Sequence, residues 1–349
     1  MDYVLAAVVL GLVILGLILL FSTSTYNGRV KFHDSAYYFK KQLFATVLGL
    51  ISMYVISRMD YRFLVKLAPV FYLASMALST LVLFIGDEYK GSKRWLSLGP
   101  LSFQPAEFAK LAVILFLTYV IATSKKKKGI WFMARVLGLI LPIVGLVGTN
   151  NLSTAIIILG IAVILIFVSN PKYLQFVGIG AGGIGFVAVF LAMESYRLER
   201  LAVWRNPEAY DKGFQTLQGL LAIGSGGLFG VGLGNSMQKL GFVPEAQNDM
   251  IFSIICEELG LVGAVLLILA FGVLIWRLSV LAMNAPDLPG LLIATGILGH
   301  IALQVILNIA VVTNTIPNKG ITLPFISYGG TSVLFLLSEM GLALSVGRR

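Results

Sequence analysis

Four carboxylates fall within the twenty residues GFVPEAQNDMIFSIICEELG, positions 241–260: Glu245, Asp249, Glu257 and Glu258. Asp249 stands where a glycine-rich segment meets an apolar run, a position that suits either a general base at a membrane surface or a helix N-cap. If the apolar run is helical from its start, Glu257 lies about 12 Å deeper than Asp249 and about 80° around the axis, and Glu258 is nearly opposite. At that depth the glutamates would not reach a headgroup, so we predict that Asp249 is the reactive carboxylate.

Polar side chains also recur inside other apolar runs. Glu107 and Lys110 are spaced to pair on one helix face, either as a structural ion pair or as a substrate contact. His300, Gln304 and Asn308 step by four and form one polar stripe, which either bonds neighbouring helices or takes part directly in chemistry.

The segment after residue 194 carries Arg197, Arg200 and Arg205 among nearby carboxylates. Solvated ion pairs are one interpretation. The other is phosphate binding, because a guanidinium can bind phosphate through two parallel hydrogen bonds.

Composition sets the class of protein that must position these groups. The chain has 349 residues, 58% hydrophobic and 12% charged, with a mean hydropathy of +0.92, whereas soluble domains carry about 25% charged residues. The sequence therefore predicts an all-α polytopic membrane protein. One cysteine and two histidines exclude an internal disulfide and a thiolate cluster. A net charge of +10 without a soluble basic face favours anionic lipid over nucleic acid as a partner.

We expect one integral membrane domain, residues 1–349, with about ten spans and both termini on the same side. An excess of Lys and Arg, including the run Lys125–Lys128, favours a cytoplasmic location for the termini. The apolar runs that define the spans are 3–22, 42–57, 66–86, 106–123, 131–148, 153–169, 174–193, 250–276, 291–312 and 324–346.

Two outer segments are long, residues 87–105 and the segment 194–249 between the seventh and eighth spans. A loop as long as the second is usually functional. Within it, residues 217–223 and 236–240 are candidates for short interfacial helices. Its glycine-rich part, GSGGLFGVGLG at 224–234, is either a nest of amide donors for an anion or a turn that re-enters the membrane surface.

Several separated motifs together resemble the SEDS family of bacterial cell-wall proteins, the RodA, FtsW and SpoVE group. The first is GSKRWLSLGPLSFQPAEFAK, which departs from the family pattern at Ser92 and Ala106. The others are Tyr196 with Arg197 and Arg200, Gln215, residues 222–245, residues 247–260 (with departures at Asn248 and Met250), Gln304, Asn308 and PNKGITLPFISYGG at 317–330.

The resemblance implies ten spans with cytoplasmic termini in the bacterial cytoplasmic membrane. It also implies a peptidoglycan glycosyltransferase that polymerises lipid II on the outer face and releases undecaprenyl pyrophosphate. The expected partner is a class B penicillin-binding protein, a transpeptidase that docks around the eighth and ninth spans. The family's essential aspartate falls on Asp249.

Roles follow as hypotheses, with Asp249 as the base. The substrate-binding candidates are Arg197, Arg200 and Lys239 for pyrophosphate, then Lys93, Arg94 and Gln215, with Glu107 and Lys110 lining a lipid groove. The structural or coupling candidates are Glu257, Glu258, His300, Gln304 and Asn308. A divalent cation, Mg²⁺ or Mn²⁺, could bridge Asp249 and phosphates, although no motif demands one.

Two other functions stay open at this level. A transporter that flips lipid-linked sugars would use Glu257, Glu258 and the polar stripe of the ninth span, but the sequence shows no inverted repeat of interrupted helices. A scaffold that positions a transpeptidase would need no chemistry of its own. The sequence does not distinguish roles in elongation, division and sporulation.

Overall fold

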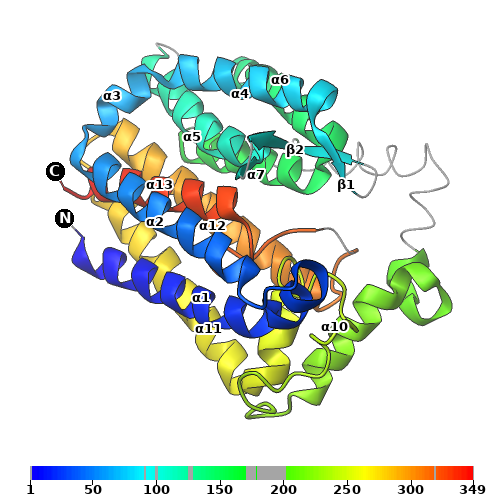
Figure 1. The fold of residues 1–349 in the computed structure, drawn as a ribbon. Helices are drawn as coiled ribbons and strands as arrows, with labels where there is room; N and C mark the ends of the chain where they lie inside the picture. The colour runs from blue at the N-terminus through cyan, green and yellow to red at the C-terminus, as the bar shows by residue number, and fades with distance from the viewer. Residues whose placement is uncertain are drawn as a thin grey trace.

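The protein is an all-α bundle with a small sheet at one end (Figure 1). The structure is a computed structural model that describes residues 2–89, 92–98, 101–124, 129–169, 178, 202–317 and 320–348. Within these ranges, eight helices are long and apolar enough to cross a membrane. They are α1 (Tyr3–Phe32), α2 (Tyr37–Arg58), α4 (Ala68–Ile85), α5 (Pro105–Thr123), α6 (Ile130–Asn150), α7 (Leu152–Ser169), α11 (Ile251–Met283) and α12 (Leu288–Val312).

A ninth apolar helix, α13 (Gly330–Val346), is shorter and begins six residues later than the predicted span 324–346. Nine of the ten predicted spans therefore correspond to helices. The remaining one, 174–193, lies outside the described residues apart from Gly178. The short helix α3 (Tyr61–Lys66) precedes α4 and takes up the start of the predicted span 66–86.

Helix α1 continues well beyond the predicted end of its span at residue 22. It runs for 30 residues, about 45 Å, and stops at His33, which adopts a left-handed conformation with φ 54°. Helix α2 starts at Tyr37, so four residues replace the expected first outer loop. Gly28 permits this sharp return, because a Cβ there would lie 2.7 Å from the backbone oxygen of Asp34.

The two termini lie close together at one end of the bundle, which we call the inner end (Figure 1). Asp2 caps α1 by accepting from the Leu5 amide at 2.9 Å and pairs with Arg277 near the end of α11 at 2.6 Å. Asp287 caps α12 and pairs with Arg62 at 2.7 Å. Near the C-terminus, a Cβ at Gly347 would lie 3.8 Å from the Asp2 side chain, so the two termini share one side, as predicted.

Small residues allow close helix packing in the core. Helix α13 packs mainly along α2, and a Cβ at Gly341 would come within 2.6 Å of the Met53 carbonyl oxygen. Helix α12 is enclosed by α5, α7 and α11, and a Cβ at Gly296 would press on the Ile114 side chain at 2.8 Å. Without a hydrophobic drive between helices in lipid, such close contact is a main source of association.

The two long outer segments contain structure of their own. Residues 87–103 form an antiparallel sheet of β1 (Asp87–Tyr89), β2 (Ser92–Leu98) and β3 (Leu101–Phe103), a feature that the sequence analysis did not predict. The later segment contains η1 (Pro207–Ala209), η2 (Asp211–Gly213) and α10 (Phe214–Ser225). Helix α10 confirms the predicted helix at 217–223, whereas residues 236–240 form turns and not a helix.

Candidate active site

Asp249 lies in the turn before α11 and does not cap that helix. The N-cap is Met250, with φ −96° and ψ 10°, and no side chain caps the first amides. The proposed alternative of a capping aspartate is therefore wrong. The half-buried Asp249 side chain instead faces the segment after α12, since a Cβ at Gly320 would lie 3.2 Å from its Oδ2.

Three elements fix the backbone around Asp249. From α12, the Asn308 side-chain amide donates to the Asp249 carbonyl at 2.9 Å and to the Ile321 carbonyl at 2.5 Å. From α1, Asn27 donates to the Gln247 side chain at 2.8 Å. The Tyr328 amide donates to the Gln247 carbonyl, also at 2.8 Å. The carboxylate is thus carried by a well-anchored turn.

The polar stripe on α12 continues inward from Asn308 as a buried network. Gln304 donates to the Thr322 carbonyl at 3.0 Å and accepts from Lys110 of α5 at 3.1 Å. Lys110 also pairs with Glu107 at 3.0 Å, which confirms the predicted pairing. The stripe therefore bonds neighbouring helices, as one of the two interpretations proposed.

The network ends at a carboxylate that the sequence analysis missed. His300 lies 2.8 Å from the Gln304 Oε1 and 2.7 Å from Glu339 of α13. His300 thus joins the α12 stripe to α13 through one contact from each ring nitrogen. Glu339 is fully buried, and as the lone acidic residue in the apolar run 324–346 it carried a sequence signal.

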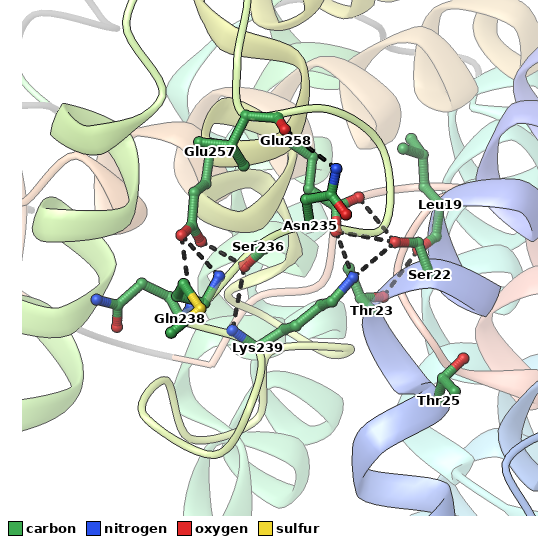
Figure 2. Close-up of polar contacts among 12 residues, drawn as sticks. Leu19, Ser22, Thr23, Thr25, Asn235, Ser236, Gln238, Lys239, Glu257 and Glu258 are labelled. Carbon is green, nitrogen blue, oxygen red and sulfur yellow. Dashed lines mark hydrogen bonds and ion pairs between the residues drawn. The ribbon is translucent and has the colours of Figure 1, made fainter.

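Glu257 and Glu258 contact the outer loop (Figure 2). Glu257 accepts from the Ser236 hydroxyl and from the Met237 amide at 3.0 Å. Glu258 pairs with Lys239 at 2.6 Å and accepts from Ser22 of α1 at 2.7 Å. Both glutamates are buried, and we call this set of contacts the carboxylate clasp.

Helix α11 is broken two residues after the clasp, at Gly260, where φ is 66° and ψ −167°. This conformation is accessible essentially only to glycine. The predicted span 250–276 is therefore a helix, with a break that the sequence analysis did not predict. A break in a membrane helix leaves backbone groups that must find other partners, because lipid offers none.

The glycine-rich loop supplies those partners from residues 227–232. The amides of Val231 and Gly232 donate to the carbonyls of Glu257 and Glu258 at 2.9 and 3.0 Å. In return, the carbonyl of Gly227 accepts from the Leu261 amide at 2.9 Å. A second such bond, at 3.1 Å, joins Val262 to Leu228. These loop amides are therefore engaged within the protein, which favours the re-entrant turn over the anion nest.

The depth assigned to Glu257 and Glu258 from the sequence also needs correction. Helix α11 has 33 residues, more than the roughly 20 that cross the hydrocarbon core. If the hydrocarbon core begins at Met283, the last residue of α11, the roughly 20 residues that cross it end near Gly263. Glu257 and Glu258 lie beyond that point. Ser22, which contacts Glu258, is likewise about 20 residues from the start of α1. The glutamates therefore lie near the outer boundary, and depth alone does not exclude them from chemistry.

The predicted cations differ in what they contact. Lys239 is buried against Glu258, so its charge is already matched. Lys93 donates to the Phe84 carbonyl at 3.2 Å, and Arg94 donates to the Asn150 carbonyl at 2.6 Å. Gln215 is half-buried on α10. Arg197 and Arg200 lie outside the described residues.

No group of three or more His, Cys, Asp and Glu side chains suited to a metal exists in the part of the chain that the structure describes. Asp249 therefore belongs to no such cluster of metal ligands among the described residues. The predicted Mg²⁺ or Mn²⁺ stays a hypothesis.

A bundle in which eight of the described helices are long and apolar enough to cross a membrane defines a polytopic membrane protein. The family model described as "Cell cycle protein", covering FtsW, RodA and SpoVE, matches residues 2–349. The chain belongs to this family.

Relatives and solved structures cover almost the whole chain. Stage V sporulation protein E of Bacillus subtilis is 40% identical, over 99% of this chain and 97% of the relative. A probable peptidoglycan glycosyltransferase FtsW of Trichlorobacter lovleyi is 35% identical, over 99% and 92%. Thermus thermophilus RodA superimposes with a TM-score of 0.73 at 31% identity, over 99% and 96%.

A fourth match comes from a solved structure described as "Structural coordination of polymerization and crosslinking by a peptidoglycan synthase complex". One of its chains has a TM-score of 0.85 at 32% identity, and the match covers 99% of this chain and 97% of that chain.

Proposed function

We propose that this chain is a peptidoglycan glycosyltransferase that polymerises lipid II on the outer face of the bacterial cytoplasmic membrane. The observation that carries the proposal is Asp249, a half-buried carboxylate on a turn anchored by α1, α12 and the segment after α12. The FtsW relatives named as probable peptidoglycan glycosyltransferases support the same activity.

The chemistry requires one base. The acceptor sugar hydroxyl attacks the anomeric carbon of the donor, and its proton passes to the Asp249 carboxylate. The new glycosidic C–O bond forms as the bond from the anomeric carbon to the pyrophosphate oxygen breaks, and undecaprenyl pyrophosphate leaves with the bonding electrons. Because pyrophosphate is a stable anion, the leaving group needs cations and not an acid, unlike the carboxylate pair of a glycosidase.

The contacts of the described residues support a division of roles within this proposal. Arg197 and Arg200 remain the candidates for pyrophosphate, whereas Lys239 is better suited to holding the outer loop through Glu258. Glu107 and Lys110 act through the buried α12 network rather than by lining a lipid groove. A divalent cation, if used, would neutralise phosphate charge beside Asp249.

The test is polymerisation of fluorescent lipid II by purified protein in detergent or nanodiscs. Wild type should form glycan chains, and Asp249→Asn should lose about 10²- to 10⁴-fold in rate, the usual worth of a general base. Asp211→Asn, at an exposed carboxylate in the same outer segment, is the matched control and should retain activity. A fully active Asp249→Asn protein would remove the catalytic assignment.

For the partner and the orientation, we propose a class B penicillin-binding protein and cytoplasmic termini. Helix α11 offers an exposed apolar stripe suited to a single membrane helix, including Leu261, Val265, Leu269 and Trp276. Helix α12 is largely buried and offers little surface. Cysteine pairs between α11 and the transpeptidase's membrane helix should crosslink, while pairs placed on α4 should not.

One observation favours the transporter as a second candidate. Helix α11 is interrupted beside two carboxylates, a feature typical of transporters. However, the break is sealed by the chain's own glycine-rich loop. Movement of fluorescent lipid II across liposomes without glycan formation would favour transport over polymerisation.

A further inference from the structure

A groove of about 880 Å³ opens along the membrane-facing side of α1. One wall is the α1 face that carries Ile14, Ile18 and Phe21, and the other is the outer loop at Leu233 and Leu240. Its volume falls within the range of about 300–1,000 Å³ that holds a single ligand. Asp249 is not among the residues that line it, and the proposed chemistry assigns no role to the apolar part of the groove.

The character of the groove changes from apolar to polar along its length. The α1 residues that line it run from Ile14 through Ser22 and Thr25 to Arg29, so the groove follows about 22 Å of helix. Its inner part is bounded by aliphatic and aromatic side chains, and its outer part by Ser22, Thr25 and Arg29. This sequence of surfaces matches an amphiphile with a long chain and a polar head.

The charge at the outer end has the sign that suits a phosphate. Arg29 is exposed and forms no ion pair with any other described residue. Lys239 also lines the groove, but Glu258 already matches its charge (Figure 2). Among the residues that line the groove, Arg29 therefore supplies the positive charge available to a ligand. Arg29 lies about two helical turns beyond Ser22, toward the outer end of α1.

The polar end of the groove adjoins the segment that carries Asp249. The Tyr26 ring lies beside Gly241, where a Cβ would sit 3.3 Å from it. The next α1 residue, Asn27, bonds to Gln247 at 2.8 Å, two positions before Asp249. A lipid headgroup at Arg29 would consequently lie close to the proposed reaction site. This proximity favours a substrate or product lipid over an ordinary membrane lipid, which takes no part in the reaction.

We infer that this groove binds the polyprenyl chain of a polyprenyl-phosphate lipid, with the phosphate at Arg29. The inference rests on the proposed function for the identity of the lipid. The chain lies along α1 between Ile18 and Leu240, and the headgroup points outward to the turn of Asp249. The groove is thereby a substrate or product site. By holding the chain and the phosphate, it sets the distance between the attached sugar and Asp249.

The experiment measures binding and does not depend on turnover. Wild type in phosphatidylcholine nanodiscs is photo-crosslinked with diazirine-labelled undecaprenyl phosphate, and the labelled peptides are mapped. We expect label on α1 and on residues 233–240. Unlabelled undecaprenyl phosphate should compete at least about tenfold better than phosphatidylglycerol or undecaprenol, equivalent to about 1.4 kcal/mol.

Four variants make the test specific. Ile18→Trp fills the groove and should weaken labelling by about tenfold, because the lipid chain no longer fits. Arg29→Gln removes the charge-assisted contact to the phosphate and should also weaken labelling by about tenfold. Leu73→Trp, at an exposed position on α4, and Lys31→Gln, at the end of α1, are matched controls that should label normally.

The outcomes separate this inference from the proposed function. Equal competition by phosphatidylglycerol, or labelling unaffected by Ile18→Trp, would overturn the groove assignment even in an active polymerase. Specific labelling of α1 in a protein that forms no glycan would support the groove and defeat the proposed function.

Discussion

At the inner end of the bundle, Asp2 and Asp287 cap α1 and α12, and each also pairs with an arginine. At the outer end, α11 begins at Ile251 without a side-chain cap and breaks at Gly260. At the inner end, aspartate side chains cap the helices. At the outer end, contacts with the glycine-rich loop and a buried ion pair hold α11 instead. Departures from local rules are expected where function is located.

The break in α11 gives the largest expected effect. Gly260→Ala should destabilise the protein by at least about 3 kcal/mol, through strained backbone and forced contacts, since a Cβ there would lie 2.4 Å from the Gly230 amide. The readout is thermal unfolding in detergent. Gly272→Ala on the same helix has no atom within 4 Å and should be neutral or slightly stabilising. Equal stability of the two variants would contradict the role of the break.

The buried pair of the carboxylate clasp comes next. Lys239→Met leaves Glu258 buried without its partner and should cost about 3–5 kcal/mol. Lys40→Met removes an exposed partner of Asp34, with side chains 67% and 39% exposed, and should leave stability almost unchanged, because water screens such a surface pair. Chemical denaturation of both variants provides the comparison. A small loss for Lys239→Met would mean that the clasp does not hold the outer loop.

Asn308 tests whether the α12 network positions the reactive turn. Asn308→Ala removes the donor to the carbonyls of Asp249 and Ile321 and should cost about 1–3 kcal/mol. Turnover should fall further than stability, with kcat affected more than KM. Asn284→Ala, at the inner end, removes an exposed contact to the Val280 carbonyl and should change neither quantity. A normal kcat in a folded Asn308→Ala protein would contradict the claim that Asn308 positions the turn of Asp249.

The smallest effect concerns pH at the inner end. Burial opposes ionisation of Asp287, but the Gly290 amide, Arg62 and Tyr61 outweigh it and hold the pKa of Asp287 below its usual value. Its stabilisation, about 1 kcal/mol or less, is therefore complete above about pH 5 and lost as the pH falls through the lowered pKa. Asp287→Asn should make the unfolding temperature less dependent on pH in that acidic range. An unchanged acid profile would contradict this assignment.

Apolar runs predicted nine of the described helices because hydrocarbon thickness sets helix length. The same argument did not reveal the break in α11, since nothing in hydropathy distinguishes Gly260 from the neighbouring glycines. The pairing of residues 227–232 with the broken helix depends on loop geometry that the composition does not encode.

The candidate site was predictable in part. The spacing of His300, Gln304 and Asn308 predicted one buried face, and the Glu107–Lys110 spacing predicted an ion pair. The match between Lys239 and Glu258 was not predictable, because it joins a turn to a helix break through side chains 19 residues apart. The groove beside α1 arises from the same loop placement.

The central claim is that Asp249 performs chemistry while the neighbouring carboxylates hold the structure. The most direct test compares Asp249→Asn with Glu257→Gln for lipid II polymerisation per folded molecule and for unfolding temperature. We predict that Asp249→Asn keeps its stability and loses about 10²- to 10⁴-fold in rate, whereas Glu257→Gln loses stability and keeps most of its turnover when folded. The reverse pattern would contradict the account.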